Sequence, residues 1–134
     1  MATDLVFFYG TLMRGFQRRV QAQIDAALTV RGRGWIRAAL FDLGDYPGAI
    51  PASDGRVWGE LYRMKDVDAV LAALDEIEDF RPAEPDASLY RRVETQVAQE
   101  DGRVETAWVF FYNAPLSQAP RIESGDYREY LRLK

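Results

Sequence analysis

The sequence predicts an α+β domain with a mixed sheet that curls toward a small barrel with flanking helices. Two kinds of pattern lead to this fold class. About six short segments carry the alternating or branched apolar residues typical of strands, and two carry apolar residues at helical spacing. The 134-residue chain has a length that suits one domain and contains no repeat or linker, so we expect residues 1–134 to form a single domain.

The first strand and the first helix are expected near the start of the chain. Residues 5–9 form a compact apolar run ended by Gly10, which is typical of a buried strand followed by a tight turn. Between residues 16 and 28 an apolar side chain recurs at every fourth position, which predicts a helix; these positions are Val20, Ile24 and Leu28. Gly32 and Gly34 are expected to end that helix.

The middle of the chain predicts two strands separated by a loop. Residues 35–43 and 57–64 have strand patterns. Between them, residues 44–55 are rich in Gly, Pro, Asp and Ser, which predicts a loop with a short paired segment at residues 49–50. The patterns leave open whether the strand at residues 35–43 runs parallel to the strand at residues 5–9.

A second helix is expected over residues 66–80, where the apolar period changes from two to that of a helix. Asp66 is expected to cap this helix, and Pro82 and Pro85 follow it as breakers. At about 100° per residue, five apolar side chains fill one stripe of the helix: Val67, Val70, Leu71, Leu74 and Ile77.

The remaining pattern predicts a hairpin. Residues 90–98 and 104–112 read as strands, with a turn at Asp101 and Gly102. The second of these strands is nearly apolar on both faces in its later half, which favours a central position in the sheet. The tail at residues 124–131 has no decisive pattern.

The absence of histidine and cysteine narrows the possible chemistry. Disulfide scaffolds, thiol nucleophiles, Ser-His-Asp catalysis and His-based metal sites are all excluded. Carboxylates, Lys, Arg, Tyr, Ser, Thr and backbone amides remain. No Asp/Glu run has the calcium-loop pattern, and we expect no metal and no cofactor.

The charge balance bears on partners and location. A formal net charge of −4 with scattered Lys and Arg disfavours a nucleic-acid partner, because phosphate binding needs a basic face. The pairs Arg18-Arg19 and Arg91-Arg92 are interpreted as solvated or structural. No apolar run reaches membrane-spanning length and no secretory signal is visible, so we expect a cytoplasmic protein without a membrane partner. The sequence does not indicate an oligomeric state.

Glu78 lies on the apolar stripe of the second helix, within roughly 45° of its centre. Burying an unpaired carboxylate costs several kcal/mol, so such a group is paired, neutral or directed into a polar cavity. One functional interpretation is a general base in a cleft, with its pKa raised by desolvation. The alternatives are a glutamate at a helix end that leans into solvent, and an ion pair with an arginine such as Arg91 or Arg92.

Further candidates follow strands or lie in loops. A glycine at the end of a buried strand can expose consecutive amides that hold a carboxylate or an oxyanion; the alternative is a simple turn. This segment comprises Tyr9, Gly10, Thr11 and Leu12. Three more tyrosines either line a pocket or simply pack against their neighbours: Tyr46, Tyr90 and Tyr112.

Taken together, these features resemble the γ-glutamylcyclotransferase-like family, which includes the plant avirulence-induced-gene-2-like proteins and the γ-glutamylamine cyclotransferases. The resemblance covers nearly the whole chain. Its most specific parts are the Tyr-Gly-Thr-Leu segment at residues 9–12 and the Leu-Asp-Glu-Ile-Glu segment at residues 74–78. The other similar segments are residues 6–8, 13–15, 46–50, 59–62, 90–92 and 124–127.

The resemblance implies a small mixed barrel with flanking helices, and it implies roles for several residues. The glutamate of the Leu-Asp-x-x-Glu segment is the catalytic residue of the family, which corresponds to Glu78. The Tyr-Gly-Ser/Thr-Leu loop binds the γ-glutamyl group, which corresponds to Tyr9, Gly10, Thr11 and Leu12. Many members have glycine directly after the glutamate, whereas this chain has Asp79. The presence of Asp79 affects the expected identity of the substrate more than the expected type of reaction.

The implied activity is release of 5-oxoproline and a free amine from a γ-glutamylamine or a γ-glutamyl amino acid. The α-amine of the γ-glutamyl group attacks its own side-chain carbonyl, so no protein nucleophile and no cofactor are needed. A carboxylate with a raised pKa can move both protons. Two alternatives stay open: a non-catalytic domain that binds or senses a small amino-acid-like ligand in the same pocket, and a purely structural partner protein. The leaving amine is not identified by the sequence.

Overall fold

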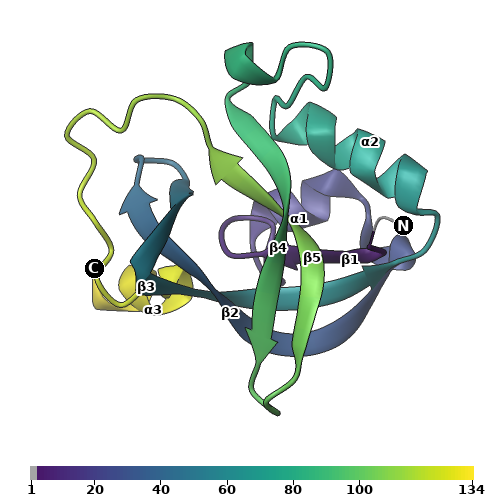
Figure 1. Cartoon of the computed structure of the whole chain (residues 1–134), viewed down its shortest axis with the longest axis horizontal. Helices are drawn as coiled ribbons and strands as arrows, with labels where there is room; N and C mark the ends of the chain where they lie inside the picture. Colours follow the sequence, from purple (N-terminus) through teal and green to yellow (C-terminus); the bar gives the residue numbers. More distant parts are fainter. Residues whose placement is uncertain (1–2) are drawn as a thin grey trace.

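The computed structural model describes residues 3–134 and consists of a closed five-stranded barrel with helices outside it (Figure 1). The barrel confirms the predicted α+β class. Its strands follow the order β1-β3-β2-β4-β5 around the barrel. The strands are β1 (Leu5–Phe8), β2 (Leu28–Asp42), β3 (Pro47–Met64), β4 (Tyr90–Gln99) and β5 (Val104–Tyr112). The helices are α1 (Gln17–Ala22), α2 (Val67–Ile77) and α3 (Tyr127–Leu133), with short 3-10 turns at Asp25–Ala27 and Pro85–Ala87.

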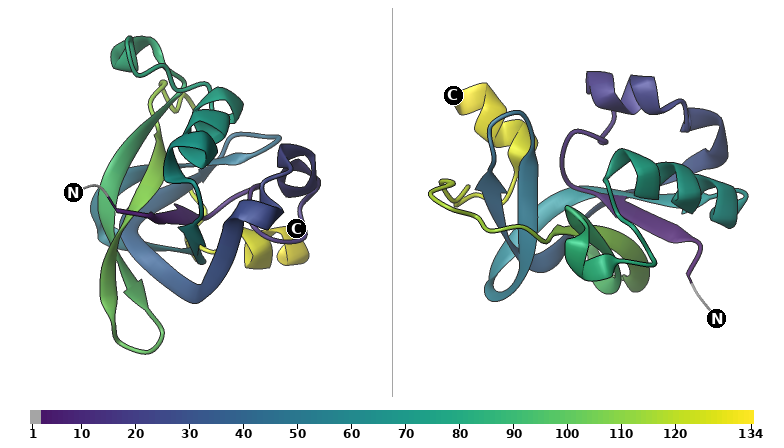
Figure 2. Two further views of the ribbon diagram at one scale, coloured as in Figure 1. Left: turned by 90° about the vertical axis from the view of Figure 1, so that its right-hand side faces the viewer. Right: turned by 90° about the horizontal axis from the view of Figure 1, so that it is seen from above.

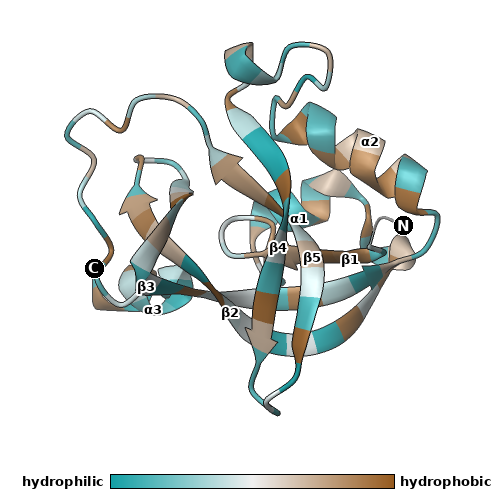
Figure 3. Cartoon of the chain, viewed as in Figure 1, coloured by the Kyte–Doolittle hydropathy of each residue, from teal (hydrophilic) through white to brown (hydrophobic). Residues whose placement is uncertain are grey.

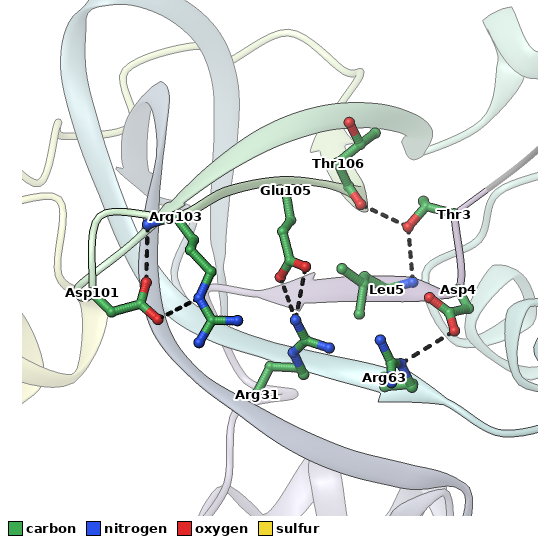
Figure 4. Close-up of polar contacts among 9 residues, drawn as sticks. All are labelled: Thr3, Asp4, Leu5, Arg31, Arg63, Asp101, Arg103, Glu105 and Thr106. Carbon is green, nitrogen blue, oxygen red and sulfur yellow. Dashed lines mark hydrogen bonds and ion pairs between the residues drawn. The ribbon is translucent and has the colours of Figure 1, made fainter.

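Two antiparallel hairpins, β2–β3 and β4–β5, build most of the barrel, and β1 closes it. Strand β1 is antiparallel to β3 and parallel to β5, where Val6 lies opposite Trp108. The strand at residues 35–43, now part of β2, is therefore not a neighbour of β1. Polar contacts hold the start of β1 in place (Figure 4): the Thr3 hydroxyl donates to the Thr106 carbonyl at 2.7 Å and accepts from the Leu5 amide at 3.0 Å.

The predicted helix over residues 16–28 is wrong in its second half. Helix α1 ends at Ala22 because Gln23 adopts a left-handed conformation with φ of 55°. The fourfold spacing of apolar residues does not mark one helix face, since Val20 is 67% exposed and Leu28 already belongs to β2. Gly32 and Gly34 lie within that strand and do not end a helix.

The predicted loop at residues 44–55 is mostly strand. Strand β3 begins at Pro47 and continues through residue 57, so residues 57–64 are only its second half. A proline is compatible with the first residue of a strand, where no ladder amide is required. Ala49 and Ile50 pair as expected, opposite Leu40 and Ala39. The ladder changes register between Arg37 and Ala38, which accommodates the polar turn residues within one long strand.

Helix α2 forms where its period predicts, but its start differs from the expectation. Asp66 is the residue before the helix, yet it has a left-handed φ of 57° and its side chain makes no capping hydrogen bond. The hairpin at residues 101–102 and strand β5 form as predicted. The undecided tail forms α3, which is capped by a hydrogen bond from the Glu129 amide to the Asp126 carboxylate.

Two of the helices, α1 and α2, lie in contact although they are far apart in the sequence. In Figure 2, α1 and α2 lie together on one side of the barrel, whereas α3 lies apart from them. The apolar face of α2 buries Val70, Leu71 and Leu74 against the barrel. Strand β1 is hydrophobic along its length (Figure 3) and all four of its residues are buried. Within residues 3–134, no helix is both long enough and apolar enough to cross a membrane.

Candidate active site

A small cavity lies between the end of β1, helix α1 and the end of helix α2. Its volume is about 30 Å³, which is room for about one water molecule. The polar groups around it come from Glu78, Arg18, Tyr90 and the segment that follows β1. Apolar side chains of β1, β3 and β5 form the rest of the wall: Phe7, Phe8, Pro47 and Phe110.

Glu78 is the buried acidic group of this cavity. It directly follows the last residue of α2 and is 7% exposed. Its carboxylate accepts no hydrogen bond from any residue between 3 and 134, although its own amide donates to the Leu74 carbonyl at 2.9 Å. Burial raises the pKa of the Glu78 carboxyl to about 7, and the charge of Arg18 partly opposes this rise. At neutral pH this group can both accept and release a proton.

The turn after α2 fixes the backbone at Glu78. Asp79 adopts a left-handed conformation with φ of 54°, and the Phe80 amide donates to the Asp75 carbonyl at 2.8 Å. This is the geometry in which helices commonly end on glycine, while Asp is among the few other residues that tolerate it. Asp79 therefore ends the helix in the conformation that glycine would also adopt.

The first alternative proposed for Glu78 from the sequence does not describe the structure, and the second, an ion pair with an arginine, forms with an arginine other than the two named. The side chain is only 9% exposed, so it does not lean into solvent. Arg92 pairs with Asp75 instead, through bonds of 2.8 and 3.1 Å. Arg91 lies 4.0 Å from Asp86. The cation that approaches Glu78 is Arg18, with 3.9 Å between Nη2 and Oε1.

The segment after β1 lines the cavity with backbone amides. The amides of Gly10, Thr11 and Leu12 have no acceptor among the residues that the structure describes. A turn closed by the Met13 amide and the Gly10 carbonyl at 3.0 Å holds this segment. Only glycine fits at residue 10, because a Cβ there would lie 2.8 Å from Cγ of Pro47. Such free amides can bind a carboxylate or stabilise an oxyanion.

Tyr9 and Tyr90 also line the cavity, but backbone groups occupy their hydroxyls. The Tyr9 hydroxyl donates to the Phe110 carbonyl at 2.6 Å and accepts from the Ala49 amide at 3.1 Å. The Tyr90 hydroxyl donates to the Pro47 carbonyl at 2.9 Å. Burial, with a smaller contribution from the charge of Glu78, raises the pKa of both hydroxyls, so both stay protonated. These tyrosines brace the walls of the cavity.

The structure does not bring all of the candidate residues together. Tyr112 lies outside the cavity and packs edge-on against Tyr90, with 5.3 Å between ring centroids. Tyr46 also lies outside it and lines a neighbouring surface hollow. Sequence reasoning placed Arg18 on a solvated or structural face and thus missed it as a cavity residue. Its approach to Ile77 and Glu78 is a contact between distant segments, which no local pattern reveals.

Comparison with known proteins agrees with the fold. The model of the family described as "Gamma-glutamyl cyclotransferase, AIG2-like" matches residues 6–129. A putative gamma-glutamylcyclotransferase from Vibrio cholerae is 34% identical over 125 residues, which are 92% of this chain and 94% of the relative.

Two further relatives extend the comparison. One from Niallia circulans, named gamma-L-glutamyl-butirosin B gamma-glutamyl cyclotransferase, is 31% identical over 109 residues, covering 81% of this chain and 66% of the relative. The crystal structure of a mouse AIG2-like protein superposes with a TM-score of 0.70 at 28% identity, covering 94% of this chain and 90% of the mouse chain. The chain belongs to the AIG2-like gamma-glutamyl cyclotransferase family.

Proposed function

We propose that this protein is a γ-glutamyl cyclotransferase that releases 5-oxoproline and a free amine from a γ-glutamyl compound, with Glu78 as its general acid/base. The observation that carries this proposal is a buried carboxylate, without a hydrogen-bond donor among residues 3–134, in a cavity rimmed by three free amides. The family match and the names of the relatives support the reaction class.

The proposed reaction is an acyl transfer within the substrate. Glu78 removes a proton from the α-ammonium group, and the resulting amine attacks the γ-carbonyl carbon. A carbon–nitrogen bond forms, and the carbonyl oxygen becomes an oxyanion. Collapse of this intermediate breaks the original amide bond, and the leaving nitrogen takes the proton from Glu78. The ring nitrogen gives up its second proton, which passes through Glu78 to the free amine, so the products are 5-oxoproline and the protonated amine, and the carboxylate is regenerated.

The loop amides and the cavity walls account for the rest of the proposed chemistry. Amides of Gly10, Thr11 and Leu12 serve as donors to the substrate carboxylate and to the developing oxyanion. Walls braced by Tyr9 and Tyr90 keep the γ-glutamyl chain folded, so that its amine and carbonyl meet. These residues position the substrate, whereas Glu78 moves the protons.

The deciding experiment measures 5-oxoproline released from a panel of γ-glutamyl amines and γ-glutamyl amino acids. The variants are Glu78→Gln and, as a matched control, Glu76→Gln, which changes an exposed carboxylate on the same helix. We expect Glu78→Gln to lower kcat by about 10²- to 10⁴-fold, as for loss of a general acid/base, and Glu76→Gln to retain activity.

Two other outcomes would contradict the proposal. An unchanged rate in Glu78→Gln would remove Glu78 from the chemistry. Binding of γ-glutamyl compounds by the wild type without any 5-oxoproline would indicate a ligand-binding or sensor domain.

A further inference from the structure

Arg18 occupies the mouth of the cavity. Within residues 3–134, it is the only basic side chain that lines the cavity, and it also lines two open hollows beside it. Its side chain is 31% exposed, whereas that of Glu78 is 9% exposed. It is therefore the more exposed of the two charged side chains of the cavity.

The contacts of Arg18 leave part of its guanidinium free. Nη2 donates to the Ile77 carbonyl at 2.7 Å, and Nη1 donates to the Thr11 hydroxyl at 3.3 Å. The first contact satisfies a carbonyl at the end of α2, which is a structural role. A guanidinium has five N–H donors in a planar fork. No carboxylate of residues 3–134 lies within hydrogen-bond distance of this one, since Glu78 is 3.9 Å away.

We propose that Arg18 selects γ-glutamyl-α-amino acids by binding the carboxylate of the leaving amino acid. This inference rests on the proposed function and names the substrate class for that site. Arginine is the side chain best suited to a carboxylate, because its fork matches the two oxygens. No other cation is available at the cavity among the described residues.

The spacing of Glu78 and Arg18 supports this assignment. Glu78 has to reach the leaving nitrogen to protonate it. In an α-amino acid the nitrogen and the nearer carboxylate oxygen are separated by two carbons, which from standard bond lengths places them about 3 Å apart. The acid and the cation, 3.9 Å apart, are therefore spaced to contact both groups at once. A simple amine has no carboxylate, and an amine at the end of a lysine side chain carries its carboxylate several bonds away.

The hollows outside Arg18 indicate which part of the substrate remains variable. The cavity holds only about 30 Å³, so the variable part of a substrate has to lie outside it. One adjoining hollow measures about 530 Å³ and is bordered by Thr11, Tyr46 and Gln21. The side chain of the leaving amino acid would lie there. We expect tolerance for that side chain together with a strict requirement for the carboxylate.

A matched pair of substrates tests the assignment: γ-glutamyl-L-alanine and γ-glutamylethylamide, which differ only in the leaving carboxylate. Wild type, Arg18→Gln and Arg14→Gln are compared by kcat/KM for 5-oxoproline release. Arg14 is an exposed arginine on the same segment that does not line the cavity, so it controls for the loss of one charge.

A charged hydrogen bond corresponds to about a ten- to hundredfold preference. We expect wild type to favour γ-glutamyl-L-alanine by that factor, Arg18→Gln to lose most of the preference, and Arg14→Gln to keep it. If Arg18 had only a structural role at the end of α2, Arg18→Gln would lower kcat/KM equally for both substrates.

The possible failures are distinguishable. Equal losses for both substrates in Arg18→Gln, or a wild type that prefers the ethylamide, would overturn the role of Arg18 while the cyclotransferase activity stands. If neither these two substrates nor any other member of the γ-glutamyl panel releases 5-oxoproline, the proposed function fails. Calorimetric binding of the same two compounds then decides the inference: an Arg18-dependent preference for γ-glutamyl-L-alanine sustains carboxylate recognition, and equal binding refutes it.

Discussion

Arg92 holds both carboxylate oxygens of Asp75 through bonds of 2.8 and 3.1 Å, one turn before Glu78. The guanidinium also lies over the ring of Trp108, 4.7 Å from its centroid. The pair joins helix α2 to strand β4, and both side chains are mostly buried. It therefore anchors the end of the helix from which Glu78 enters the cavity.

Substitution Asp75→Asn should destabilise the protein by about 3 kcal/mol, because it leaves the buried Arg92 charge without its partner. Urea unfolding measures the change. The control is Asp68→Asn, an exposed aspartate in the first turn of the same helix, for which we expect less than about 1 kcal/mol. Similar losses in both variants would show that the Arg92 pair does not anchor the helix.

The stability of the protein should fall as pH rises, because of the titration of Glu78. The pKa of this carboxyl is raised from 4.5 to about 7, so between these values the native state keeps a proton that the unfolded chain has lost. The stabilisation is full below pH 4.5 and is lost as pH rises through about 7, which amounts to about 3 kcal/mol.

Urea unfolding of wild type and Glu78→Gln from pH 4.5 to 8 measures this effect as a difference, in which the other carboxylates cancel. We expect the free energy of unfolding of Glu78→Gln to rise relative to that of wild type as pH rises. Parallel curves would mean that Glu78 titrates alike in the folded and unfolded states.

The pH dependence of turnover should depend on Arg18. The proposed reaction begins with ionised Glu78, so kcat/KM should rise as pH increases through about 7. The charge of Arg18 lowers the pKa of Glu78, and Arg18→Gln should therefore move the inflection to higher pH. Profiles taken with γ-glutamylethylamide keep carboxylate binding out of the comparison. Arg14→Gln should leave the inflection in place, and an unmoved inflection in Arg18→Gln would contradict the electrostatic coupling.

The segment before α3 has a structural role that a glycine substitution should reveal. The Trp58 amide donates to the Gly125 carbonyl at 2.8 Å, and a Cβ at residue 125 would overlap the Arg56 carbonyl oxygen. The φ of Gly125 is also positive, at 68°. Gly125→Ala should therefore cost about 2–4 kcal/mol in urea unfolding.

The neighbouring substitution Ser124→Ala is the control for Gly125→Ala and should cost less than about 1 kcal/mol. Activity per folded molecule should persist in both variants, because residues 124 and 125 do not line the cavity. A stable Gly125→Ala protein would show that the tail can dock without this close approach.

Local patterns predicted the elements whose neighbours are close in sequence. The β4–β5 hairpin and the stripe of α2 follow from residues within one element or one turn, and the stripe also pointed to Glu78. The β2–β3 ladder could not be read this way, because strand pairing overrode the turn composition of residues 44–55. Helix α1 ended early for a similar reason, since Leu28 pairs with Met64.

In the candidate site, too, the residues with a local signal were predicted and those that depend on distant contacts were missed. Glu78 and the loop after β1 were found from pattern and resemblance, and the structure places them around one cavity. Arg18 was missed because its position depends on Ile77, 59 residues later in the chain. Tyr112 was included because it lies on the strand opposite Tyr90, whereas its ring packs behind the cavity wall.

The closure of the barrel by four residues has a practical consequence. If Leu5–Phe8 detached, β3 and β5 would each present an unpaired edge, and unpaired edges recruit strands from other molecules. The Thr3 contacts to β5 and the pairing of Asp4 with Arg63 therefore protect against strand exchange and aggregation. A fusion partner or tag placed directly before this strand would endanger solubility, whereas one attached after α3 would leave the closure intact.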